Sequence, residues 1–305
     1  MFHELLHLNE EVEDAIQKKK PIVVLESTLI AQGMPYPENL ATAQSVEQMI
    51  RDNGAIPATI ALYQGLIHIG IDNTVMKQLA TGKKIFKASR RDIAFVLSQK
   101  LTASTTVAAT MFCAKLAGLS IFVTGGIGGV HHHVNDSFDI SADLVELGTT
   151  PVTIVCSGAK SILDLPKTLE VLETHGVAVV GYRTNEFPAF YSQSSGIFLT
   201  HRLDYPDEIA SMMHYQRKLG INKGIIIANP IPKTAEIPDD KILPFIKQAQ
   251  QEANHLNGKT ITPFLLHRIA ELTAGQSLQA NIELFKSNAI LGTQIAVAYQ
   301  KSPFN

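Results

Sequence analysis

Val152-Thr153-Ile154-Val155-Cys156 is a short run of mostly apolar and β-branched residues, and a helical segment follows it closely. The run does not alternate between polar and apolar residues, which is typical of a strand covered by helices on both faces. Similar runs recur along the chain at Ile22–Leu25, Thr59–Tyr63, Ile121–Thr124, Val177–Gly181 and Gly224–Ala228. This alternation predicts an α/β protein, a three-layer α/β/α sandwich around a largely parallel or mixed central sheet.

Segments of helical period lie between and after these runs. They are Asn39–Arg51, Thr106–Ala117, Ser161–His175, Asp207–Leu219, Asp240–His255, Pro263–Ala274 and Ser277–Tyr299. No Gly/Ser-rich or Pro-rich linker and no internal repeat interrupts the pattern. We therefore expect residues 1–305 to form a single domain.

Composition narrows the class of protein. The 305 residues are 45% hydrophobic and carry 26 basic against 28 acidic side chains, so no strong positive field favours a nucleic acid partner. No apolar run reaches the roughly 18 residues that cross a bilayer, and the first residues do not resemble a signal peptide, so we expect a cytoplasmic protein without a membrane partner. Cys113 and Cys156 lie in apolar stretches and are expected to be free and buried.

Polar residues directly after the predicted strands are the first candidates for chemistry, because open α/β sheets bind ligands beyond the carboxyl ends of their strands. Glu26 follows Ile22–Leu25 and suits a general acid or base, although a salt bridge would explain it equally. Lys87 precedes the polar cluster Ser89-Arg90-Arg91-Asp92, which suits phosphate. A solvated helix start is the alternative for this cluster.

The segment Thr124–Gly129 holds four glycines and follows a predicted strand. Such a loop lets backbone amides approach an anion or a sugar closely. It matches neither a nucleotide phosphate loop nor a dinucleotide fingerprint. His131, His132 and His133 follow, but adjacent side chains rarely converge on one zinc ion and no cysteine lies near.

Asp139 and Asp143 are four residues apart, so both carboxylates would share one face of a helix. Two oxygen donors placed in this way suit a hard divalent cation such as Mn²⁺ or Mg²⁺. The alternative is a helix start whose acids complement the helix dipole.

Lys160 follows Ser157-Gly158-Ala159 and precedes the helix expected from Ser161. A lysine at a helix N-terminus is electrostatically misplaced. Burial among small residues would also disfavour the ammonium form and leave a neutral amine able to attack a carbon. A lysine with its head group in solvent is the alternative.

A set of motifs, in one order from about Pro21 to Tyr299, matches a known family. These are Glu26–Leu29, Gly33–Pro35, Pro57–Thr59, Ser89–Asp92, Thr124–His131, Phe138–Leu144, Gly158–Asp164, Ala228–Pro232 and Thr262–Leu266. The chain resembles the pseudouridine-5'-phosphate glycosidases, a family that includes the indigoidine synthase A proteins. The resemblance implies reversible cleavage of the C–C glycosidic bond of pseudouridine 5'-phosphate with water, giving uracil and ribose 5-phosphate through a lysine imine with ring-opened ribose.

The resemblance also implies roles for particular residues. It places Lys160 as the nucleophile, Glu26 as the proton donor and Asp139 as the ligand of a Mn²⁺ cofactor. Substrate-binding positions implied in this way are Lys87, Val107, Ser141, Ala142, Asp143, His131 and Asn281. A homotrimer is implied as well.

The chemistry explains why a lysine is needed. Carbon has no lone pair that an acid could protonate, so the paired carboxylates of ordinary glycosidases do not suffice, and an amine supplies the electron sink. Two other functions fit the same residues: an aldolase-type lyase, which would release a carbonyl fragment, and a sugar-phosphate sensor, which would bind without turnover. A sugar kinase would need a nucleotide phosphate loop, which the sequence lacks.

Overall fold

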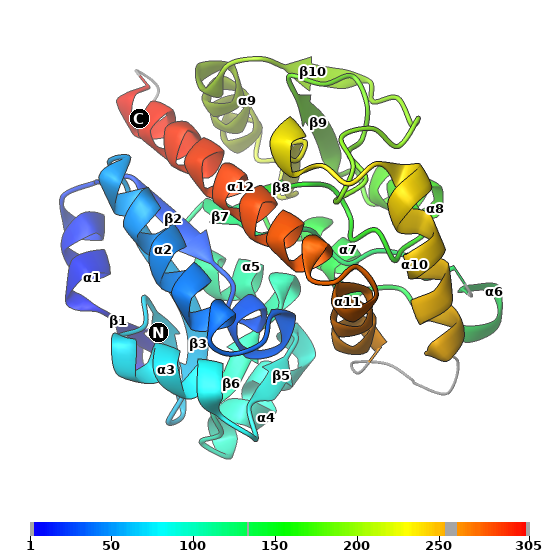
Figure 1. Cartoon of the computed structure of the whole chain (residues 1–305). Coiled ribbons are helices and arrows are strands. Elements are labelled where there is room, and N and C mark those ends of the chain that lie inside the picture. The colour runs from blue at the N-terminus through cyan, green and yellow to red at the C-terminus, as the bar shows by residue number, and fades with distance from the viewer. Residues whose placement is uncertain (1–2, 133, 254–260, 303–305) are drawn as a thin grey trace.

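The computed structural model describes residues 3–132, 134–253 and 261–302 (Figure 1). The strands are β1 (Leu6–Leu8), β2 (Ile22–Leu25), β3 (Ile56–Tyr63), β4 (Leu66–Ile69), β5 (Phe86–Ala88), β6 (Ala103–Thr105), β7 (Ile121–Val123), β8 (Thr153–Cys156), β9 (Ala178–Tyr182), β10 (His201–Leu203) and β11 (Ile225–Ala228). The helices are α1 (Glu10–Gln17), α2 (Glu38–Asp52), α3 (Asn73–Thr81), α4 (Ile93–Ser98), α5 (Val107–Leu116), α6 (Val134–Ser137), α7 (Ala142–Leu147), α8 (Leu165–Thr174), α9 (Pro206–Lys218), α10 (Asp239–Glu252), α11 (Ile261–Leu272) and α12 (Gln276–Lys301).

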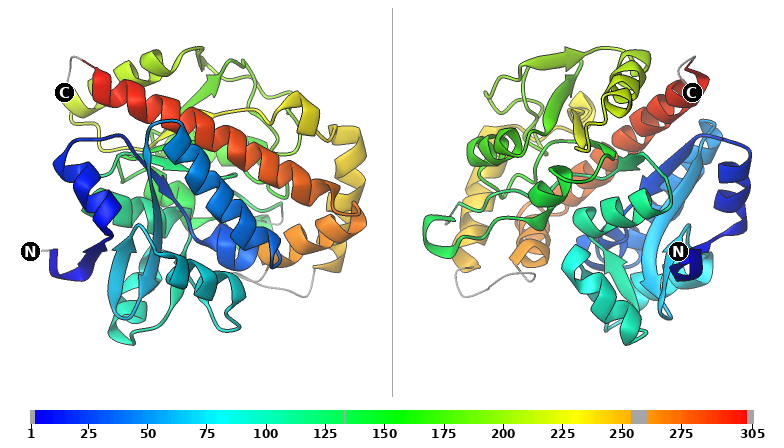
Figure 2. Two further views of the ribbon diagram at one scale, coloured as in Figure 1. Left: turned by 60° about the vertical axis from the view of Figure 1, so that its left-hand side comes forward. Right: turned by 180° about the vertical axis from the view of Figure 1, so that it is seen from behind.

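All eleven strands belong to one mixed sheet. The strands β3-β2-β7-β8-β11-β9-β10 are neighbours in that order and run parallel. Beside β3 the sheet continues through β4 and β6, which pair with it in the antiparallel sense. Helices α2 and α12 cover one face, and α5 lies against the other (Figures 1 and 2). The predicted three-layer α/β/α sandwich is therefore confirmed.

The chain changes direction across the sheet between β2 and β7. From β2 it moves outward to β3 on one side, and it later returns to place β7, β8 and β11 on the other side. Ligands of open α/β sheets bind at such a switch point, beyond the carboxyl ends of the strands. The residues that follow β2, β7 and β8 are therefore the ones that the topology brings to a binding site.

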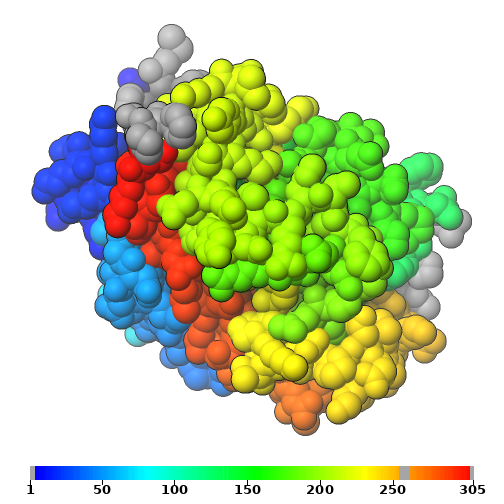
Figure 3. Space-filling view, turned by 90° about the horizontal axis from the view of Figure 1, so that it is seen from above, coloured from blue at the N-terminus to red at the C-terminus, as the bar shows by residue number. Residues whose placement is uncertain are grey.

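Helix α12 is the longest in the described structure and packs across β2, β7 and β8. It also contacts α2 and α9, so it joins the two ends of the sheet, and from above it lies between the N-terminal elements and α9 (Figure 3). A Cβ atom at Gly292 would lie 2.2 Å from Cγ2 of Val123 on β7. Only glycine permits this close approach of helix to sheet.

Each predicted strand and helix is found, but several boundaries differ. The largest shift is at the helix expected from Ser161, which begins at Leu165 because the Asp164 side chain caps it by accepting from the Lys167 amide. The short strands β1, β4, β5, β6 and β10 and the helices α1, α3 and α6 were not predicted, and the helices α4 and α7 were expected only as helix starts without bounds. No helix in the described ranges is long and apolar enough to cross a membrane.

The two cysteines are free and buried, as expected. Burial raises the pKa of both thiols, Cys113 and Cys156, to about 12. At neutral pH they are protonated and serve as small apolar side chains.

Glu47 on α2 is a buried carboxyl group that contacts β3. It is 8% exposed, and its Oε1 accepts a 2.6 Å hydrogen bond from Thr59 on β3. Arg51 lies 3.4 Å from its Oε2 but is also paired with Glu11 at 2.8 Å. Burial raises the pKa of Glu47, against the lowering effects of Thr59 and Arg51. The folded protein therefore binds this proton more tightly than the unfolded chain does.

The Glu47→Gln variant should unfold with a larger free energy than the wild type at about pH 8. A raised pKa in the folded state means that Glu47 stabilises the fold when protonated and loses this contribution as the pH rises through the folded pKa. Gln keeps the acceptor for Thr59 and carries no charge. The gain should vanish near the unfolded value of 4.5. Urea unfolding of both proteins at about pH 8 and pH 4 measures this difference in the free energy of unfolding. A variant less stable than the wild type at pH 8 would mean that the ion pair with Arg51 stabilises the charged Glu47 by more than its burial costs.

Candidate functional site

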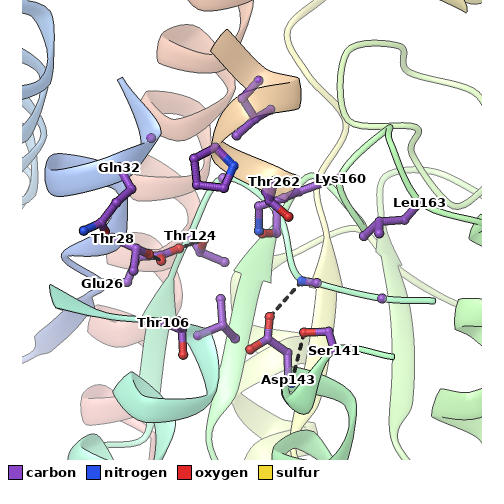
Figure 4. Close-up of a pocket in the computed structure, with 18 of the residues that line it drawn as sticks. Glu26, Thr28, Gln32, Thr106, Thr124, Ser141, Asp143, Lys160, Leu163 and Thr262 are labelled. Atoms are coloured by element: carbon purple, nitrogen blue, oxygen red, sulfur yellow. Dashed lines mark hydrogen bonds between the residues drawn. The ribbon is translucent and has the colours of Figure 1, made fainter. Parts of the chain in front are cut away.

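A cavity of about 310 Å³ opens at the carboxyl edge of the sheet, at the switch point between β2 and β7 (Figure 4). Its walls come from the segments after β2, β7 and β8, from the N-termini of α5 and α7, and from α11 and α12. The cavity brings together the residues to which the family resemblance gives a role: Glu26, Lys87, Val107, His131, Asp139, Ser141, Ala142, Asp143, Lys160 and Asn281. Glu26 and Asn281, which lie near opposite ends of the chain, thus line the same cavity.

Glu26 follows β2 directly and is 6% exposed. Its two carboxylate oxygens accept hydrogen bonds from different hydroxyl groups, Oε2 from Thr28 and Oε1 from Thr124. Thr124 follows β7, the strand next to β2, so the two strand ends meet at this carboxylate (Figure 4). The hydroxyl groups fix the orientation of a buried acid that faces the cavity.

Lys160 enters the cavity from the segment after β8, opposite Glu26 (Figure 4). Its Nζ donates a 2.6 Å hydrogen bond to the carbonyl oxygen of Gly126, in the glycine-rich loop. Among the described residues no carboxylate forms an ion pair with it. The amine of Lys160 is thus held inside the cavity by a neutral acceptor, where it can reach a bound molecule.

The expectation that Lys160 stands at a helix N-terminus is wrong. Residues 160–164 form a turn, and α8 begins only at Leu165. The turn is fixed by backbone bonds, since Lys160 donates its amide to Ile127 and Asp164 donates its amide to Val130. The helix dipole therefore does not act on this amine at close range, and its setting is the glycine-rich loop.

Asp143 joins two segments that line the cavity by accepting a backbone hydrogen bond from each. It is 7% exposed, its Oδ1 accepts the Ala108 amide at 3.0 Å, and its Oδ2 accepts the Gly128 amide at 2.8 Å. A Cβ atom at Gly128 would lie 2.2 Å from Ser141 Oγ, so the loop must be glycine here for this contact to form. Asp143 thus ties the N-terminus of α5 to the glycine-rich loop.

The Asp143→Asn variant should lower the free energy of unfolding by roughly 1–3 kcal/mol, because its amide group would face a backbone N–H donor in a buried position. Asp72→Asn is the matched control. Asp72 caps α3 by accepting the Val75 amide at 2.8 Å, and asparagine caps helices equally well. Urea unfolding of both variants tests this, and equal losses would contradict it.

Asp139 and Asp143 do not share a helix face, contrary to the sequence-based expectation. Helix α6 ends at Ser137, Phe138 has a φ of 50°, and α7 begins after Ser141, so Asp139 lies in the connection between two helices. Asp139 Oδ2 lies 3.8 Å from His131 Nε2. Burial lowers the pKa of His131, against the raising effect of Asp139.

The described residues contain no group of three or more His, Cys, Asp and Glu side chains arranged to hold a metal ion. The protein would therefore offer a cation the Asp139 carboxylate, with the His131 imidazole beside it. This donor set suits an ion such as Mg²⁺ or Mn²⁺ that keeps several waters and binds through one or two carboxylates plus the substrate. His133 lies outside the described residues.

Basic residues gather at one end of the cavity. Lys87 on β5, Ser89 and Arg91 line it. The neighbouring Arg90 turns away, because it pairs with the buried Glu146 at 3.0 Å and lies over the ring of Phe112. Of the cluster expected to bind phosphate, Lys87, Ser89 and Arg91 are therefore placed to do so.

Asn281 on α12 presents a buried acceptor to the cavity. The residue is 6% exposed, and among the described residues its Oδ1 has no hydrogen-bond partner. Buried polar atoms without partners are rare, so a donor from a bound molecule is the natural complement.

Several lining residues had no expected role. They are Thr28, Gln32, Thr124, Leu163, Phe190, Thr262, Pro263 and Leu266. Thr28 and Thr124 were detectable, because hydroxyl residues adjoin a carboxylate and a glycine-rich loop at strand ends. Phe190 and the α11 residues reach the cavity only through tertiary packing.

Comparisons with known proteins show what the chain is similar to. The family model for indigoidine synthase A like proteins matches residues 11–298. A pseudouridine-5'-phosphate glycosidase from Legionella pneumophila is 66% identical over 305 residues, covering 100% of this chain and 99% of that protein. Another from Geobacillus kaustophilus is 52% identical over 296 residues, covering 96% of this chain and 98% of that protein.

Two solved structures share the fold. A crystal structure of an indigoidine synthase A-like protein from Thermotoga maritima superimposes with a TM-score of 0.90 at 33% identity. The prealnumycin C-glycosynthase in complex with ribulose 5-phosphate gives a TM-score of 0.90 at 32% identity. Each comparison covers 97% of both chains.

Proposed function

Since this chain belongs to the indigoidine synthase A like family, we propose that its cavity binds pseudouridine 5'-phosphate and that it works as a pseudouridine-5'-phosphate glycosidase. It cleaves the carbon–carbon glycosidic bond with water and releases uracil and ribose 5-phosphate. The observation that carries this proposal is the placement of Lys160 and Glu26 in one cavity with a basic end. We further propose that the protein is a cytoplasmic homotrimer. Light scattering, which measures the mass of the particle in solution, tests the trimer.

The reaction begins with attack of the Lys160 amine on C1' of the ribose. The C1'–O4' bond breaks, and the ring oxygen receives a proton from Glu26, which the hydroxyls of Thr28 and Thr124 orient. The ribose is then open, and C1' carries both the lysine nitrogen and uracil.

Glu26, now a carboxylate, takes a proton from the Lys160 nitrogen and passes it to C5 of uracil, which allows the C1'–C5 bond to break. Its electron pair stays with the uracil, and the nitrogen lone pair forms a C1'=N imine with Lys160. Water adds to the imine carbon and gives a carbinolamine. Breakage of its C–N bond frees ribose 5-phosphate and restores the amine. The atoms balance as pseudouridine 5'-phosphate plus water giving uracil plus ribose 5-phosphate.

Binding groups surround this chemistry. Lys87, with Ser89 and Arg91, holds the phosphate at the basic end, and this remote binding energy orients C1' toward Lys160. Asn281 offers its free Oδ1 to a substrate donor. Val107, Ser141 and Ala142 line the wall between these groups.

Asp139 would hold a Mn²⁺ ion, with His131 next to it. When bound, the ion would add positive charge beside the reacting groups. Mn²⁺ dependence of uracil release, with Asp139→Asn as the variant, tests this assignment.

The test of the function is release of uracil from pseudouridine 5'-phosphate with Mn²⁺ present, with unphosphorylated pseudouridine in parallel. We expect release that requires the phosphate. A carbonyl fragment in place of uracil would point to an aldolase-type lyase. Thermal stabilisation by the substrate without any product, under every metal condition, would point to a sensor.

A further inference from the structure

Asn288 on α12 is fully buried and is not among the residues that line the cavity. Its Nδ2 donates to the carbonyl oxygen of Thr124 at 2.9 Å and to Ser157 Oγ at 3.2 Å. Its Oδ1 accepts from Asn229 Nδ2 at 2.9 Å. Thr124, Ser157 and Asn229 follow the adjacent strands β7, β8 and β11, so one side-chain amide joins three strand ends.

Two of these contacts lead directly to the reacting groups. The hydroxyl of Thr124 donates to Glu26, so the backbone that Asn288 holds also carries the hydroxyl that orients the acid. Ser157 begins the segment that ends in Lys160, and its amide donates to the carbonyl oxygen of Gly125 at 2.9 Å. The Asn288 amide therefore links the segment of the acid to the segment of the amine.

Buried polar groups need hydrogen-bond partners, so Asn288 could serve only to satisfy the polar groups around it. The partners of Asn288, however, lie at the strand ends that carry the cavity. We propose that Asn288 is a positioning residue that fixes Glu26 and Lys160 relative to each other by joining the ends of β7 and β8. This inference rests on the catalytic roles proposed above for those two residues.

Asn288→Asp is the sharpest variant, because it keeps the size of the side chain and an acceptor for Asn229. It replaces the donor to Thr124 with an oxygen that cannot donate when ionised. We expect kcat for uracil release to fall about 10²-fold, the usual consequence of displacing catalytic groups by about 1 Å. KM should change little, since Asn288 does not line the cavity.

Thr293→Val is the matched control. Thr293 is also fully buried on α12, and its hydroxyl donates to the carbonyl oxygen of Ala289 in the same helix. This variant should lose stability without losing kcat. If both variants lose kcat equally, Asn288 serves the helix alone and the proposal is overturned.

A double-mutant cycle with Glu26→Gln separates positioning from general damage. If Asn288 acts through Glu26, Asn288→Asp should cost much less in the Glu26→Gln background than in the wild type. A full multiplicative loss would overturn the proposal. A wild type that releases no uracil would instead sink the proposed function, and this inference with it.

The Asn229→Ala variant covers the case in which Asn288→Asp does not fold. Asn229 holds the acceptor side of the Asn288 amide, and its loss should loosen Asn288 without placing a charge in the core. We expect a smaller fall in kcat with the same pattern in the cycle. Unchanged kcat in a folded Asn229→Ala protein would contradict the proposal.

Discussion

Lys160→Ala should lower the rate of uracil release by at least about 10³-fold, because the amine proposed to form the C1'=N bond is removed. Borohydride treatment of the wild type with ribose 5-phosphate should leave a covalent adduct on Lys160, detectable by mass spectrometry. The variant should show none. Ribose 5-phosphate should still raise its melting temperature, since the basic end of the cavity is intact.

Lys223→Ala is the matched control for this variant. Lys223 Nζ also donates a 2.6 Å hydrogen bond to a main-chain carbonyl oxygen, that of Gly148, but Lys223 does not line the cavity. Its loss should cost stability and leave both the turnover and the trapped adduct. A fully active Lys160→Ala protein, or an adduct that persists in it, would exclude the imine mechanism.

The layers of the fold were predictable because its central strands are buried on both faces. The runs Ile22–Leu25 and Gly224–Ala228 match β2 and β11 to within a residue, and all four residues of β11 are buried. The edge strands were not predictable in the same way. His201 and Arg202 of β10 are exposed, so the strand has no apolar run to reveal it.

The site was predictable where its residues directly follow strands. Glu26 and Lys160 were found in this way, and the topology explains why they converge. Local starts and stops were less certain. Asp164 and Pro166 signal the true start of α8, while the left-handed backbone of Phe138, which separates Asp139 from Asp143, leaves no clear mark in the sequence.

Residues that reach the site through tertiary packing were beyond sequence reasoning. Thr262 and Leu266 on α11 and Phe190 after β9 line the cavity, but nothing near them in the sequence indicates a ligand. Asn288 is one polar residue among many on a long helix. Only the packing of α12 on β7, which Gly292 permits, shows that its amide meets three strand ends.

Glu26→Gln should lower uracil release by about 10²–10⁴-fold, because the amide keeps the shape of the side chain but cannot transfer the proton that ring opening requires. Adduct formation by Lys160 with ribose 5-phosphate, whose open-chain aldehyde needs no ring opening by the enzyme, should be affected much less. Glu47→Gln is the matched control, since Glu47 is also a buried glutamate bonded to a threonine hydroxyl and lies outside the cavity. Equal turnover in the two variants would remove Glu26 from the mechanism, whereas loss of turnover with the adduct retained would assign proton transfer to Glu26 and bond formation to Lys160.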